Sequence, residues 1–330
     1  MCSVILLAGI SLSFGFYSLA PGNEQHSTEE FSRAQISNGI IKLSLFLPDP
    51  QKGYYRGTRF DWSGIISQVE YKGHTYFGEW KTTHDPGNHD DIVGPVEEFR
   101  TRGAALGYHE AKVGESFVKI GVGLLEKPDE PEYRFSHPYR IIKPGTWKIN
   151  SGEDWIEFQQ DFRDESGWGY LYAKRISLAK GKPEFTIAHS LKNTGSKTIE
   201  THQYNHNFFV IDGEPIGKSY VLRFPFDVKA TRDLKGIMEA RGNELIFNQD
   251  LEEGSLFTEL EGFGTDAKDH EIVIENKKTG AGVKIKGDRP LAQFYFWTVK
   301  TTICPEPYIE LNLGPGEEEK WEASYLFFSN

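Results

Sequence analysis

Two short segments of this 330-residue chain hold the side chains best suited to chemistry. The first, residues 201–209, reads Thr-His-Gln-Tyr-Asn-His-Asn-Phe-Phe. Successive side chains of a β-strand alternate between faces, so His202, Tyr204 and His206 would share one side. An apolar core is a poor place for them, because each unpaired buried polar group costs about 1–3 kcal/mol. A cleft wall is therefore expected, and a histidine satisfied by a backbone carbonyl is the competing interpretation.

The second segment places a carboxylate between two prolines, at Pro305, Glu306 and Pro307. Proline fixes its own backbone angle and lacks an N–H donor, so Glu306 is expected on a stiff stretch outside a regular strand ladder. A carboxylate whose direction is set before a ligand arrives suits a general base. The alternative is a solvated glutamate in a surface loop.

Strand patterns dominate the chain that must position these residues. Residues 41–45, 118–124 and 185–191 alternate between apolar and polar or small side chains, which predicts half-buried strands. Turn residues separate such runs at short intervals, and no stretch longer than a dozen residues has a helical apolar period. We therefore predict one all-β domain over residues 38–330, made of large antiparallel sheets packed face to face.

The composition excludes several classes of protein. With 14% aromatic residues and both charge signs interspersed, the chain is not disordered. A net charge of -11 without a clustered basic surface excludes nucleic acid as a partner. Only Cys2 and Cys304 are present, so no disulfide framework is expected. Neither the composition nor the motifs predict the oligomeric state.

The first twenty residues are uncharged and mostly apolar, and a polar segment follows them directly. Ser18 and Ala20 have the spacing that signal peptidase favours, which predicts a signal peptide over residues 1–20 and an N-terminal extension over residues 21–37. The chain would then be exported to the periplasm or the outside of the cell, with no membrane association after cleavage. The expected Lys or Arg near the start is missing, so a membrane anchor or a buried strand stays open.

Four pieces of the sequence resemble the galactose mutarotase-like superfamily, which holds aldose 1-epimerases and hexose-6-phosphate mutarotases. They are residues 188–195, 204–209, 304–307 and 313–317, in the family's order and spacing. The resemblance implies a large antiparallel β-sandwich and a mono- or oligosaccharide ligand.

The resemblance also implies roles for individual residues. His206 would be the general acid and Glu306 the general base that together open a sugar ring, with no cofactor and no metal. Trp297 and its aromatic neighbours would line the sugar cleft, together with His202 and Tyr204.

Three further residues are candidates for binding the substrate. Asn88 precedes His89, as in the family's histidine-glycine segment, but the glycines that should follow are replaced. A guanidinium fork at Arg59 suits hydroxyls or a carboxylate, and a surface ion pair is equally compatible. Glu97 and Glu98 cannot face the same side of a strand, and we assign Glu97 to the cleft. Carboxylates of residues 94–110 could instead hold Ca²⁺ or remain solvated.

The functions compatible with these patterns fall into three classes. The first is an aldose 1-epimerase-like isomerase that interconverts sugar anomers. The second is a carbohydrate-binding protein without catalysis, and the third is a polysaccharide lyase or hydrolase, because fold does not fix function.

Overall fold

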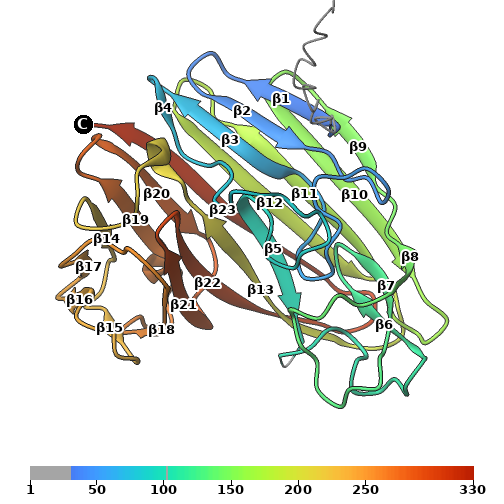
Figure 1. Ribbon diagram of the computed structural model, residues 1–330. Coiled ribbons are helices and arrows are strands. Elements are labelled where there is room, and N and C mark those ends of the chain that lie inside the picture. Colours follow the sequence, from blue (N-terminus) through green and yellow to red (C-terminus); the bar gives the residue numbers. More distant parts are fainter. Residues whose placement is uncertain (1–30, 102) are drawn as a thin grey trace, which may run out of the picture. The chain divides into compact units, whose positions relative to one another are not determined.

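Antiparallel β-strands make up almost all of the regular structure in the computed structural model, which describes residues 31–101 and 103–330 (Figure 1). They form sheets of ten, six, four and three strands. Two short 3-10 turns, η1 (Ile211–Gly213) and η2 (Ala267–Asp269), are the other regular elements of these residues. No helix within them is long and apolar enough to cross a membrane. The predicted all-β architecture with large antiparallel sheets is confirmed.

The ten-stranded sheet forms the back layer in the view of Figure 1. In spatial order its strands are β16 (Met238–Arg241), β17 (Glu244–Phe247), β14 (Tyr220–Arg223), β19 (Glu271–Asn276), β20 (Ala281–Gly287), β23 (Glu318–Ser329), β12 (Glu184–Asn193), β11 (Gly169–Leu178), β10 (Trp155–Arg163) and β9 (Lys148–Ser151).

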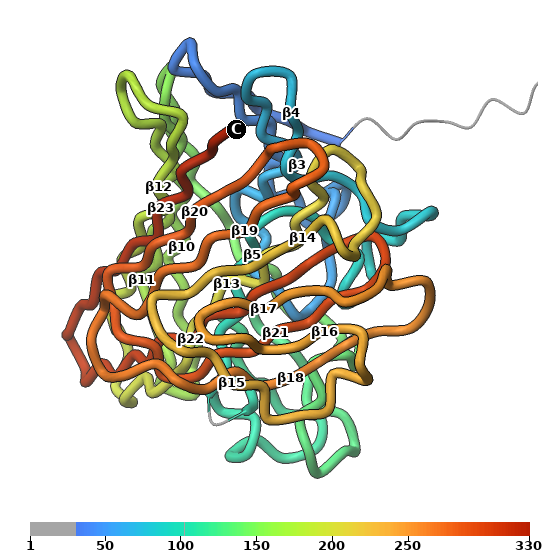
Figure 2. Tube along the Cα trace, turned by 90° about the vertical axis from the view of Figure 1, so that its left-hand side faces the viewer, coloured from blue at the N-terminus to red at the C-terminus, as the bar shows by residue number. Residues whose placement is uncertain are grey.

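The six-stranded sheet carries the candidate site, and two smaller sheets lie beside it. Its spatial order is β15 (Lys229–Ala230), β18 (Ser255–Glu261), β21 (Gln293–Val299), β22 (Thr302–Leu313), β13 (Ile199–Phe208) and β5 (Gly94–Arg100). The smaller sheets are β1 (Arg33–Ser37), β2 (Lys42–Phe46), β3 (Ile65–Tyr71) and β4 (His74–Thr75), and β6 (Ser116–Lys119), β7 (Gly123–Glu126) and β8 (Ile141–Pro144). Figure 2 looks onto the end at which β14 to β18, from both large sheets, lie together.

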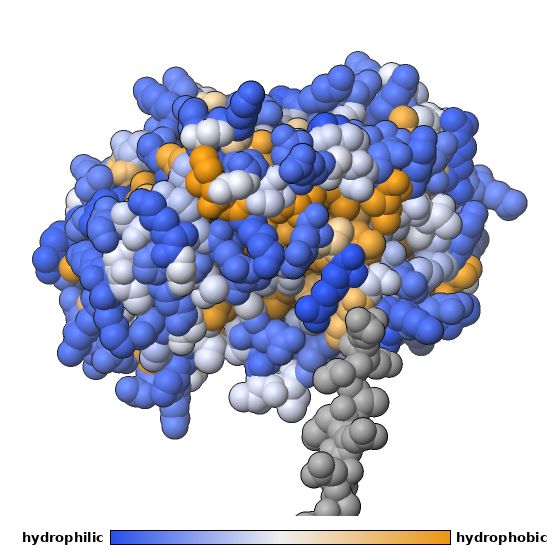
Figure 3. Space-filling model, turned by 90° about the horizontal axis from the view of Figure 1, so that it is seen from above, coloured by the Kyte–Doolittle hydropathy of each residue, from blue (hydrophilic) through white to orange (hydrophobic). Residues whose placement is uncertain are grey.

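The core lies between the ten-stranded sheet and the sheets in front of it. Strands β10 and β12 alternate strictly between buried and half-exposed residues, so one face of each packs inward. Phe158 and Ile187 from the back layer pack in one cluster with Ile66 and Phe296 from the front layers. The face of the molecule in Figure 3 is mainly hydrophilic, with apolar residues gathered near its middle.

Two of the three predicted strands are confirmed and one is corrected. Residues 41–45 and 185–191 correspond to β2 and β12. Residues 118–124 form the β6–β7 hairpin instead of one strand, because the chain turns at Gly121, whose φ is +82°. A side chain at Gly121 would also lie within 2.7 Å of Asp61, so glycine is required there.

The beginning of the chain is described from Phe31. The predicted signal peptide, residues 1–20, lies outside the described residues. Strand β1, which pairs with β2, falls within the segment 21–37 that we assigned to an N-terminal extension. Arg33–Ser37 are therefore part of a sheet.

Candidate active site

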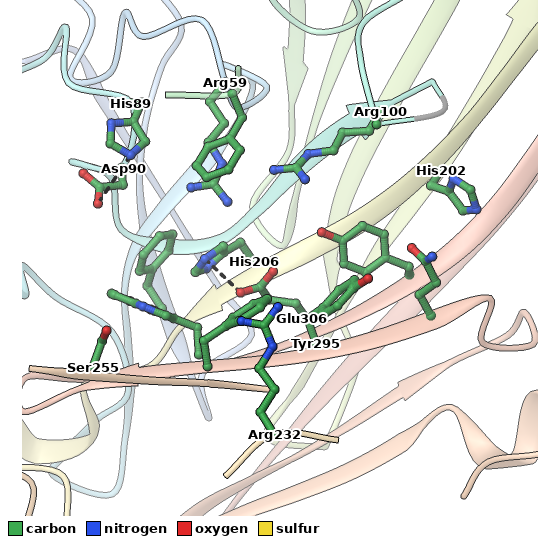
Figure 4. A pocket seen from close by; sticks show the side chains of 17 residues that line it. Arg59, His89, Asp90, Arg100, His202, His206, Arg232, Ser255, Tyr295 and Glu306 are labelled. Atoms are coloured by element: carbon green, nitrogen blue, oxygen red, sulfur yellow. Dashed lines mark ion pairs between the residues drawn. The ribbon is translucent and has the colours of Figure 1, made fainter. Parts of the chain in front are cut away.

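Two neighbouring strands bring the predicted acid and base together. β13 and β22 pair antiparallel as far as Tyr204 opposite Tyr308. Two residues further along, the same register places His206 opposite Glu306. The two side chains meet, with His206 Nε2 3.2 Å from Glu306 Oε1, as Figure 4 marks.

Glu306 lies inside strand β22, so its expected place outside a strand ladder is corrected. β21 continues to pair across Pro305 and Pro307. The ladder with β13 stops before the prolines and resumes only in a bridge between Phe209 and Ile303. Because proline has no N–H to donate, it interrupts pairing on one side of the strand only. The break frees space beside Glu306 while β21 still holds its backbone.

The pair borders a cavity of about 790 Å³ on the face of the six-stranded sheet. Side chains from β5, β13, β18, β21 and β22 form one part of its wall, and irregular segments before and after β5 and after β15 form the rest (Figure 4). The lining residues are Arg59, His89, Asp90, Arg100, Gly103, Phe135, His202, His206, Phe208, Arg232, Ser255, Phe257, Gln293, Tyr295, Trp297, Glu306 and Tyr308.

Burial governs the protonation of the pair. It raises the pKa of Glu306 from 4.5 to about 7, although Arg59 and Arg100 act in the opposite direction. Burial also lowers the pKa of His206 well below 6.5, and the positive charge of Arg59 adds to this effect. Groups in contact titrate as a pair. From the pKa of His206 up to about pH 7, the pair therefore holds one proton.

Aromatic packing sets the direction of the His206 ring. Phe208 stacks on it with centroids 4.0 Å apart and an interplanar angle of 14°. Phe60 and Trp297 meet it edge-on at 5.6 and 5.9 Å. His206 Nδ1 is buried and has no hydrogen-bond partner among the described residues. The ring is thus oriented by its aromatic neighbours, and Nε2 is left to face Glu306.

A second carboxylate, Glu98, holds three cations beside the pair. Its oxygens accept from Arg59 Nε at 2.9 Å, Arg100 Nε at 2.8 Å and Lys119 Nζ at 3.0 Å. The Tyr204 hydroxyl also donates to it. These cations hold the pKa of Glu98 well below its usual range despite burial, and burial lowers the pKa of Lys119 to about 8. Three cationic side chains share a single carboxylate, so this wall of the cleft keeps a net positive charge.

Arg59 reaches the cleft from residues 53–64, an irregular segment fixed against the sheet. The backbone N–H of Asp61 donates to the carbonyl of Glu97 at 2.9 Å. The Tyr172 hydroxyl donates to the Asp61 carboxylate at 3.0 Å from the back sheet. Burial raises the pKa of this carboxyl to about 7. Backbone and side chain of one aspartate therefore position the guanidinium two residues away.

Glu97 points away from the cleft, which corrects its assignment to substrate binding. It is fully buried behind the sheet and accepts from Lys174, His189 and Asn205. Burial alone would raise its pKa, but the charges and hydrogen bonds of Lys174 and His189 together outweigh burial and lower the pKa to about 2. Glu98, the next residue, is the one on the cleft side, as the alternation of β5 requires.

Solved structures share this architecture. A galactose mutarotase-like protein from Lactobacillus casei matches with a TM-score of 0.54 at 11% identity, over 90% of this chain and 100% of its own. A candidate aldose 1-epimerase from Escherichia coli matches with a TM-score of 0.55 at 14% identity, over 91% of this chain and 100% of its own. A galactose mutarotase related enzyme from Lactobacillus acidophilus matches with a TM-score of 0.52 at 13% identity, over 90% of this chain and 97% of its own. The chain has the galactose mutarotase-like fold. No family model and no curated protein sequence matches it.

Within this fold, six of the eight predicted site residues line the cavity, all except Glu97 and Tyr204. They are His206, Glu306, Arg59, His89, His202 and Trp297. Tyr204 lies just beneath it, fully buried, with its hydroxyl bonded to Glu98.

Sequence reasoning missed several residues that line the cleft. Tyr308 had a usable signal, because it lies two residues from Glu306 on the same strand and shares its face. Arg100 shares a strand face with Glu98, so the assignment of Glu97 to the cleft placed Arg100 on the opposite side. Arg232 and Phe257 had no comparable signal, since they come from a segment after β15 and from β18, which only the fold brings to the cleft.

The carboxylates that suggested a Ca²⁺ site are used elsewhere. Glu97 and Glu98 pair with buried cations on opposite sides of β5, and Glu110 pairs with Lys197 at the surface. In the described part of the chain, no group of three or more His, Cys, Asp or Glu side chains is arranged to hold a metal ion.

Proposed function

We propose that this chain is an aldose 1-epimerase-like enzyme that interconverts sugar anomers by acid–base ring opening. The observation that carries the proposal is the contact of His206 with Glu306 at the edge of a cavity large enough for a sugar. The likeness to aldose 1-epimerase structures supports the fold of such an enzyme, and the reaction is our inference from the pair.

The reaction needs two proton transfers and no net change in protons. A base removes the proton from the anomeric hydroxyl at O1, the C1–O5 bond breaks as the C1 carbonyl forms, and an acid delivers a proton to O5. Rotation about C1–C2 and the reverse steps give the other anomer. One donor and one acceptor are enough, and the pair supplies both.

The single proton of the pair can occupy either partner. With His206 as imidazolium and Glu306 as carboxylate, the roles are those that the family resemblance implies. Burial shifts both groups toward neutral imidazole and neutral carboxylic acid. In both arrangements one group accepts the proton of O1 while the other donates a proton to O5. The reaction therefore needs one proton on the pair, whichever partner holds it.

Replacing each member of the pair tests this function. His206→Gln and Glu306→Gln should each lower the catalysed rate of anomer interconversion by about 100-fold or more, the usual worth of a general acid or base. Polarimetry or NMR of freshly dissolved aldoses measures the rate. His109→Gln and Glu110→Gln, at two exposed positions, are matched controls that should keep it.

The same assay separates the competing functions. A chain that binds sugar but leaves every tested aldose at its spontaneous rate would be a carbohydrate-binding protein. A lyase would release unsaturated uronate, which absorbs in the ultraviolet. Unchanged rates in both pair variants would remove the proposed site.

We also propose that the chain is exported through its N-terminal segment, on the evidence of the uncharged apolar residues 1–20. Expression with this segment should release a protein whose N-terminal sequence begins at Pro21. Retention of the segment on the mature protein would contradict cleavage.

A further inference from the structure

The cleft continues past the catalytic pair across two more strands. Tyr295 on β21 lies opposite Glu306, and Phe257 on β18 lies opposite Trp297, the next cleft-facing residue of β21. Neighbouring strands are about 4.8 Å apart, so this surface extends roughly 10 Å beyond Glu306. We infer that the cleft binds an acidic oligosaccharide, whose second sugar packs on Tyr295 and Phe257 and whose anionic group pairs with Arg232. This inference rests on the proposed function for the reacting sugar only.

The surface beyond the pair is aromatic and open to a ligand. Tyr308 meets Tyr295 edge-on at 5.4 Å, and Tyr295 stacks with Phe257 at 5.6 Å and 12°. Phe257 is 37% exposed and lines the cavity, so its ring is accessible to a ligand. Exposed apolar surface inside a cavity favours the apolar face of a ligand ring. The aromatic row thus offers a place for a ring next to the reacting one.

The size of the cavity agrees with a ligand of more than one ring. Pockets for drug-sized ligands span about 300–1,000 Å³, and this cavity of about 790 Å³ lies in the upper part of that range. A single pyranose held at His206 and Glu306 would leave the stretch along β18 unfilled.

Arg232 gives the far end of the cleft a free positive charge. Its backbone N–H donates to Thr258 Oγ1 at 3.1 Å, which fixes its position beside β18. Its guanidinium carbon lies 4.7 Å from the ring centroid of Phe257 and its side chain lines the cavity, extending toward Glu306 in Figure 4. Among the described residues it makes no ion pair, and Glu259 on the same face of β18 makes none with it.

The other charged residues around the cavity also favour an anionic ligand. Arg59 and Arg100 share one carboxylate, Glu98, with a lysine. The lining carboxylate Asp90 is paired with Lys81. The cleft is therefore cationic in a chain of net charge -11, and such a local field attracts anions. A guanidinium fork at the second ring suits a carboxylate in particular, which makes a uronate the expected second unit.

Calorimetric titration of the full chain tests the inference. The probes are disaccharides from digests of pectate, alginate and hyaluronan, each with its uronate monomer and with neutral disaccharides. At least one acidic disaccharide should bind about tenfold tighter than both its monomer and every neutral disaccharide, a difference of ~1.4 kcal/mol. No such preference in the panel would overturn the inference.

Substitutions at the proposed site of the second sugar test whether its residues cause the preference for an acidic disaccharide. Arg232→Gln and Phe257→Ala should each remove most of the tenfold preference and leave monomer binding unchanged, whereas Arg232→Lys should keep part of it. Both side chains are at least partly exposed, and circular dichroism confirms folding. Equal losses for monomer and disaccharide would refute the assignment.

The outcomes of this test and of the anomer assay are independent. A chain that accelerates anomer interconversion but shows no acidic disaccharide preference loses only the inference about the second sugar. A chain with the preference and without catalysis loses only the proposed reaction.

Discussion

The Glu306→Gln substitution should change the stability of the folded chain and its catalytic rate in opposite directions. The Glu306 carboxyl has a pKa of about 7 in the fold and 4.5 ordinarily, because burial disfavours its charged form. The folded protein thus binds this proton more tightly than the unfolded chain. The resulting stabilisation is complete below pH 4.5 and is lost as the pH rises through 7.

The magnitude follows from the shift. One pKa unit corresponds to ~1.4 kcal/mol, so between pH 5 and pH 8 this group should cost the protein about 2.5 kcal/mol of unfolding free energy. Glutamine does not ionise and escapes the loss. Over that range the Glu306→Gln variant should therefore gain about 2.5 kcal/mol relative to the unsubstituted chain, while its catalytic rate falls.

Urea unfolding followed by tryptophan fluorescence at pH 5 and pH 8 measures the difference, and the chain has seven tryptophans as probes. His206 is present in both proteins, so the comparison reports the loss of the carboxyl together with its effect on the imidazole that it contacts. Glu110→Gln, at an exposed residue paired with Lys197, should show the same pH dependence as the unsubstituted chain. Parallel stability curves for Glu306→Gln and the unsubstituted chain would refute the reasoning.

Three further predictions follow from the same site. Anomer interconversion should slow above about pH 7 as the last proton leaves the His206–Glu306 pair, and a rate flat from pH 6 to 9 would contradict this protonation. Glu98→Gln should lower the urea-unfolding free energy by about 3–5 kcal/mol because three cations lose their carboxylate, and Lys119→Met should cost less since two arginines still pair with Glu98. Burial raises the pKa of the Cys304 thiol well above its usual range, so a thiol reagent should modify it only as the protein unfolds, with the modified peptide identified by mass spectrometry.

The face of β13 that carries the site was predictable from sequence alone. Alternation with a period of two is a local property, and it placed His202, Tyr204 and His206 together as the structure has them. The contact of His206 with Glu306 is of another kind. It depends on a pairing between residues 100 positions apart, which only the family resemblance suggested.

The choice between Glu97 and Glu98 shows where local reasoning ends. Alternation states that the two face opposite sides of β5. Which side becomes the cleft depends on residues 53–64, which cover one face and bring Arg59 to Glu98. That covering is a long-range event, so the pattern of the strand contains no information about it. The same holds for Arg232, which follows β15 and reaches the cleft only because β15 pairs with β18.

The adjacent glutamates of β5 also bear on how this strand finds its partner during folding. β5 is at the edge of its sheet and pairs there with β13 alone. A slip by one residue would turn every side chain to the opposite face. A slip in one direction would replace Glu97 beside Lys174 with its apolar neighbour. A slip in the other direction would replace Glu98 beside Lys119 with its apolar neighbour. Because an unpaired buried charge costs about 3–5 kcal/mol, the two lysines on opposite sides of the strand reject both misregistered pairings.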